Sequence, residues 1–177
     1  MSLAVASLAL SGCLGSEEAG KPPSEESAKP ADEPTVAQAH RVQMQLEPGW
    51  QAAEQSLTPK LLDPKELLTV GTLSMKPGGC ATLPIRTLEA MGAGDALITI
   101  QERDGGRPGD YPPRPKRFRV DPAVYDFECA PPDLKMQPFL FSEAGRHFYA
   151  VAAVERKAPL DEVEAILNSF EASPEPN

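Results

Sequence analysis

The clearest periodic pattern in the chain lies near its C-terminal end. From residue 160 to 170, apolar residues recur every three or four positions, which is typical of a helix with one buried face. The apolar residues of that face are Leu160, Val163, Ile166, Leu167 and Phe170. The preceding segment, residues 147–155, is apolar on both alternating faces, which favours a strand near the middle of a sheet. The pattern therefore predicts a central strand followed by an amphipathic helix.

Shorter alternating patterns predict the remaining strands of the sheet. They cover residues 41–46, 66–75, 96–101, 118–120, 124–129 and 139–142. Residues 143–146 predict a hairpin turn in which Gly145 takes a positive φ. A short helix is predicted over residues 83–91, because Pro84 suits a first helical turn and Gly92 suits a stop. We therefore expect an α+β fold: an antiparallel sheet with one inserted short helix and a C-terminal amphipathic helix packed on one face.

The N-terminal part of the chain carries no pattern that buries apolar area. An apolar run ending at Leu10 is too short to cross a bilayer, which takes about 20 residues as a helix, and it is typical of an export signal. The segment after it is rich in Pro, Ser and acidic residues, which predicts disorder. We therefore expect four parts. They are a signal peptide over 1–12, an acidic Pro-rich linker over 13–38, an α+β domain over 39–172 and a disordered tail over 173–177.

The net charge of the chain limits the classes of partner that it can bind. A formal net charge of −9 over 177 residues argues against general nucleic-acid binding, which needs a basic surface. The same charge repels anionic lipid, so surface electrostatics do not hold this protein at a membrane. Membrane attachment would therefore require a covalent anchor.

The segment Leu10-Ser11-Gly12-Cys13 resembles the lipobox of bacterial lipoproteins. The resemblance implies cleavage after Gly12, a diacylglyceryl group on the sulfur of Cys13, and further acylation such as palmitate. Two or three acyl chains anchor a protein stably, whereas one chain is marginal. The implied location is the extracytoplasmic face of a cell membrane. The chain departs from the family pattern because no Lys or Arg precedes Cys13, which leaves open a start upstream of Met1 or a chance apolar N-terminus with a free cysteine.

The other two cysteines suit an exported protein. Once Cys13 is assigned to the anchor, Cys80 and Cys129 form an even remainder, as expected in an oxidising compartment. Their pairing would close a loop of about 50 residues and stabilise the fold by roughly 4 kcal/mol in the chain-entropy model.

Catalytic and metal-binding patterns are weak in this sequence. His40 and His147 are the only histidines, and neither lies in a cluster with metal-ligand spacing, so we expect no metal and no cofactor. A Cys80–His147 dyad would require Cys80 to be a free thiol, which export disfavours. We therefore expect a protein that is not an enzyme. The alternatives are an envelope enzyme whose site has no recognised motif and a purely structural spacer with no ligand.

A Pro- and Tyr-rich loop concentrates positive charge in this otherwise acidic chain. We consider it as a docking surface for an anionic envelope partner such as a cell-wall polymer, a lipid headgroup or an acidic protein segment. The alternative is a solvated loop whose cations balance nearby acids. The candidate docking residues are Arg107, Arg114, Lys116 and Arg117, flanked by Arg103 and Arg119.

The last predicted strand and the helix ending in Ile-Leu-Asn-Ser-Phe are similar to PsbP-like domains over about a fifth of the chain. The similarity contains no motif residue, so it transfers no function. Taken together, the sequence predicts a monomeric, membrane-anchored extracytoplasmic lipoprotein that acts as a non-catalytic binding or interaction module of the cell envelope.

Overall fold

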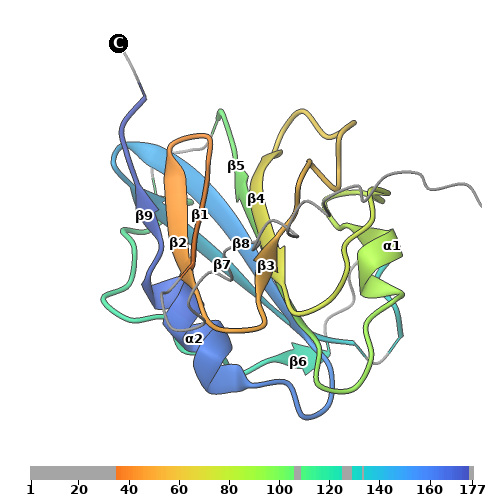
Figure 1. Cartoon of the computed structure of the whole chain (residues 1–177). Helices are drawn as coiled ribbons and strands as arrows, with labels where there is room; N and C mark the ends of the chain where they lie inside the picture. The colour runs from red at the N-terminus through yellow and green to blue at the C-terminus, as the bar shows by residue number, and fades with distance from the viewer. Residues whose placement is uncertain (1–34, 106–108, 125–128, 133, 176–177) are drawn as a thin grey trace, which may run out of the picture. The chain divides into compact units, whose positions relative to one another are not determined.

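The part of the chain that the structure describes contains two antiparallel sheets and two helices (Figure 1). The computed structural model describes residues 35–105, 109–124, 129–132 and 134–175. These residues belong to one unit that spans 31–177. The predicted α+β class is confirmed, although the strands divide into two sheets instead of the single one expected.

The larger sheet has six strands in the order β3-β4-β5-β8-β7-β6, and the smaller has three in the order β1-β2-β9. The strands of the larger sheet are β3 (Gln51–Ala52), β4 (Lys65–Gly71), β5 (Ala96–Glu102), β6 (Ala123–Val124), β7 (Lys135–Glu143) and β8 (Arg146–Val154). Those of the smaller sheet are β1 (Thr35–Ala39), β2 (Val42–Leu46) and β9 (Glu171–Ala172). The helices are α1 (Ile85–Leu88) and α2 (Leu160–Asn168).

Strand β8 lies between β5 and β7, which confirms the predicted central strand. It pairs with β7 through a two-residue turn, Ala144-Gly145, in which both residues have positive φ values of 52° and 76°. Such turns match the natural twist of a hairpin. The glycine that the sequence placed in the turn therefore occupies a position that requires its conformational freedom.

One face of the larger sheet is covered by the smaller sheet and by α2, which together enclose the main apolar core. Four phenylalanines from different segments meet there, with ring centroids 5.1–5.4 Å apart, mostly edge to face. They are Phe118, Phe141, Phe148 and Phe170. The predicted apolar face of the C-terminal helix thus packs against the sheet, as its periodicity indicated.

The other face of the larger sheet carries a smaller apolar cluster. Its members come from β5, β7 and β8 and from the segments on either side of α1. They are Leu83, Leu88, Leu97, Leu134, Met136, Val151 and Ala153. Along β4 and β5, three of the side chains buried on this face are polar. They belong to Thr69, Thr99 and Gln101. This face therefore buries less continuous apolar area than the first.

Several predicted boundaries differ from the structure. The strand expected over 66–75 is β4, which ends at Gly71, and the strand expected over 139–142 is part of the longer β7. Ser173, expected in the disordered tail, donates its backbone N–H to the carbonyl of Arg41. Strand β1 begins at Thr35, inside the segment expected to be linker up to residue 38, because it pairs with β2 and buries Ala37 in the core. Residues 118–120 form no strand, and hydrogen bonds to α2 hold them instead. The predicted helix over 83–91 is helical only over α1. The predicted strand 124–129 falls mostly on residues 125–128, outside the described residues.

A buried arginine connects the two sheets. Arg146, at the start of β8, forms an ion pair with Glu102 of β5, with Nη2 lying 2.8 Å from Oε2. It also donates to the backbone carbonyls of His40, Arg41 and Ser173, which border β1, β2 and β9. The hydrogen bond with Glu102 raises the pKa of Arg146 despite the opposing effect of burial. This single side chain thus ties the smaller sheet to the larger one.

Replacing Arg146 with Met should destabilise the fold strongly, because it leaves the Glu102 carboxylate and three carbonyls without their donor. We expect a loss of about 3–5 kcal/mol in the free energy of unfolding, measured by urea denaturation. The control, Arg117→Gln, removes an exposed ion pair and should cost less than about 1 kcal/mol. A loss for Arg146→Met as small as that of the control would contradict this role.

Candidate functional site

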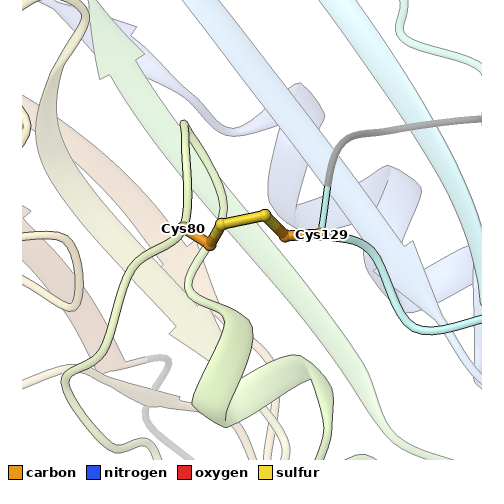
Figure 2. The surroundings of a disulfide bond; sticks show 2 residues. All are labelled: Cys80 and Cys129. Atoms are coloured by element: carbon orange, nitrogen blue, oxygen red, sulfur yellow. A yellow bond between two sulfur atoms is a disulfide. The ribbon is translucent and has the colours of Figure 1, made fainter.

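The structure brings Cys80 and Cys129 together in a disulfide, as the sequence predicted (Figure 2). Their Cα atoms lie 6.1 Å apart, and 49 positions separate them along the chain. The bond joins the loop before α1 to the segment that leads into β7. Both segments cover the face of the larger sheet opposite the main core, which we call the second face. Cys13, the predicted lipidation site, lies outside the described residues.

The disulfide removes the thiol that a Cys80–His147 dyad would need. The imidazole of His147 stacks on the ring of Tyr111 instead, with centroids 4.8 Å apart and planes at 18°. His147 therefore packs against Tyr111, an aromatic residue of the loop between β5 and β6.

The cations of the predicted docking loop make several contacts within the protein. Arg114 Nε lies 3.2 Å from Glu143 Oε2, its Nη2 donates to the Asn168 carbonyl at 2.8 Å, and its guanidinium lies over the Phe118 ring. Arg117 pairs with Glu164 of α2 at 3.5 Å.

Two of the candidate docking residues have no such contact described. Lys116 is exposed, and Arg107 lies outside the described residues. A docking role for this loop stays a prediction. The contacts of Arg114 and Arg117 nevertheless show that its charge is partly used to attach the loop to α2.

A cleft of about 740 Å³ lies elsewhere, against β7 and β8. Its apolar surface comes largely from Leu140, Tyr149 and Tyr111, and its charge from Arg103 and Asp110. The complete lining is Thr82, Arg103, Gly105, Asp110, Tyr111, Leu140 and Tyr149. A volume of this size is within the range of small-molecule sites. The sequence pattern singles out Arg103 as part of a cationic loop but gives no reason to place it beside Tyr149.

Strand register explains how these residues meet. Tyr149 of β8 lies directly opposite Leu140 of β7 and opposite Gln101 of β5. Directly opposed residues share a face of a sheet, so the three side chains form a row across the strands. Gln101 Nε2 donates to the carbonyl of Thr82 at 2.6 Å, which holds another lining residue beside this row.

The cleft combines apolar surface with a few polar groups. Leu140 is 49% exposed although it is a large apolar residue in a regular strand. Burial raises the pKa of the Tyr149 phenol, while the positive charge of Arg103 acts in the opposite direction. The phenol is therefore neutral at pH 7 and can donate a hydrogen bond. Within the described part of the chain, the buried Oε1 of Gln101 has no hydrogen-bond partner.

The position of the hairpin turn in the sequence is enough to predict that two of the cleft residues, Leu140 and Tyr149, lie opposite each other. A two-residue turn at Ala144-Gly145 pairs Glu143 with Arg146, and counting outward pairs Leu140 with Tyr149. The contributions of Arg103 and Tyr111 depend on a second strand pairing and on a loop, which no local pattern reveals.

The described ranges contain no group of three or more His, Cys, Asp or Glu side chains arranged to hold a metal ion. In the same ranges, no helix has the length and apolar character needed to cross a membrane. Comparisons with protein-family models, curated proteins and solved structures found no match. The lipoprotein and PsbP-like resemblances therefore stay predictions.

The pKa of Tyr149 can be measured directly. Absorbance titration at alkaline pH of the wild type minus a Tyr149→Phe variant should isolate one tyrosine that ionises above the ordinary value of 10.0. Arg103→Gln should move this ionisation to still higher pH, because it removes the positive charge that favours the phenolate. A Tyr149 ionisation at or below the ordinary value would contradict the burial described here.

The contacts of Arg114 predict a structural effect that a surface cation would not have. Arg114→Ser should lower the free energy of unfolding by about 1–2 kcal/mol, because it removes a charged hydrogen bond and the contact with Phe118. Lys116→Ser should change it by less than about 0.5 kcal/mol. Equal effects in chemical denaturation would mean that Arg114 does not attach the loop to α2.

Proposed function

We propose that this protein is a lipid-anchored, extracytoplasmic binding module of the cell envelope, without catalytic activity of its own. Cys13 carries the anchor, and residues 35–175 form the domain that presents the cleft over Leu140 and Tyr149. The observation that carries the proposal is the Cys80–Cys129 disulfide. Disulfides between distant segments persist in oxidising compartments and are rare in the cytosol.

The cleft supports binding as the activity. Its lining combines a leucine and two tyrosines with the polar side chains of Thr82, Arg103 and Asp110, a mixture of apolar surface and orienting groups that suits a small-molecule site.

A lipid anchor makes a specific prediction about location. Wild-type protein expressed in its native host should sediment with membranes, resist a 1 M salt wash, and show by mass spectrometry an acylated Cys13 and an intact Cys80–Cys129 bond. A Cys13→Ser variant should appear in the soluble fraction, because the printed sequence contains no run of about 20 apolar residues and carries a formal net charge of −9.

The matched control for this experiment is Lys116→Ser with Arg117→Ser. These changes remove loop cations and leave the anchor intact, so the double variant should stay with the membranes. Loss of the double variant from membranes that retain the wild type would assign attachment to the basic loop. A mature protein that is unlipidated, reduced and soluble would contradict the proposed function as a whole.

A further inference from the structure

We infer that the cleft binds a small carboxylate ligand with a flat apolar body, the carboxylate pairing with Arg103 and the body lying against Leu140, Tyr149 and Tyr111. The inference rests on the proposed function, that the domain is a binding module. It adds the chemical class of the ligand and the residues that select it.

The apolar wall is the first argument. Leu140 is 49% exposed in the middle of β7, while Phe141, the next residue along, is buried in the main core. Exposed leucines are ordinary when they stand alone, but this one lies directly opposite Tyr149 and shares the cleft with Tyr111. The ring of Tyr111 is held by its stack on His147. Two aromatic rings and a leucine thus form a prepared surface for a flat apolar group.

The charge at the end of this wall is the second argument. Arg103 follows β5 directly, and its backbone N–H donates to the carbonyl of His147 at 3.1 Å, which places the residue beside Tyr149. Its side chain is 45% exposed and pairs only loosely with Asp63, with Nε and Oδ1 3.8 Å apart. An exposed pair of this kind contributes little. A ligand carboxylate that forms two parallel hydrogen bonds with the guanidinium would replace it at small cost.

The remaining polar groups favour the same ligand. The Tyr149 phenol is a neutral donor, suited to an acceptor oxygen. Asp110 also lines the cleft and makes an interaction within the protein. Arg103 is the positively charged group of the lining, and its ion pair with Asp63 is long and exposed.

The test uses a matched pair of probes, 2-naphthoate and the neutral 2-naphthamide, which share one flat apolar body. The protein is the full chain with Cys13→Ser, purified without a lipid anchor and with the disulfide intact. We expect calorimetry at pH 7 and low salt to show saturable binding of 2-naphthoate at least about tenfold tighter than that of 2-naphthamide, since a charge-assisted pair is worth that ratio.

Four variants divide the contributions. Arg103→Gln should abolish the preference for naphthoate and leave the affinity for naphthamide within about twofold. Asp63→Asn should tighten naphthoate by about two- to fivefold, because it removes the competing carboxylate, and should leave naphthamide unchanged. Leu140→Ser should weaken both probes. Arg119→Gln, which loses an exposed cation paired with Glu164 away from the cleft, is the control and should change neither. Near-ultraviolet circular dichroism confirms that each variant is folded.

Two results would overturn the inference: no saturable binding of 2-naphthoate by the wild type, or equal affinity for the two probes. A preference that survives Arg103→Gln would also reject it. These outcomes concern the ligand class alone. Lipidation of Cys13 and the membrane fraction are measured separately, so failure here and failure of the proposed function are distinguishable.

Discussion

The burial of β8 on both faces is the constraint on which the rest of the structure depends. Because β8 lies between β5 and β7, its backbone donors and acceptors are paired on both sides. Small side chains, Ala150, Ala152 and Ala153, let other elements approach closely. Phe148 extends from one face into the aromatic core, and Tyr149 extends from the other into the cleft. One strand therefore positions both the main core and the candidate site.

The two faces of the larger sheet are stabilised differently. The face under α2 and the smaller sheet is mostly apolar apart from the buried Arg146–Glu102 ion pair, and burial of apolar area accounts for most of its packing. The other face includes polar side chains and depends more on specific bonds. There the carboxylate of Glu66 accepts hydrogen bonds from the backbone of Leu57 and Thr58 and from the hydroxyls of Ser56, Thr58 and Thr69.

These bonds hold the loop before β4 against the sheet, while the disulfide holds the segments around α1 and before β7. In the chain-entropy model, a bond closing about 50 residues contributes roughly 4 kcal/mol. The candidate cleft lies on this second face, where fewer apolar side chains compete for the space. An open, partly polar site is therefore compatible with a well-packed domain, because the opposite face supplies the continuous core.

The sequence by itself determined the features that arise from neighbouring residues. Helix α2 and the β7–β8 hairpin follow from local periodicity and from one glycine, and the even remainder of cysteines predicted the bond between Cys80 and Cys129. Only the tertiary structure decided the pairing of β1 with β2, the division into two sheets, the attachment of Arg114 to α2, and the meeting of Arg103 with Leu140 and Tyr149. The physical reason is that these contacts depend on strand register and on loops that join distant segments. A pattern of apolar and polar positions predicts which residues are buried, but it does not predict which residue of a distant strand lies opposite each of them.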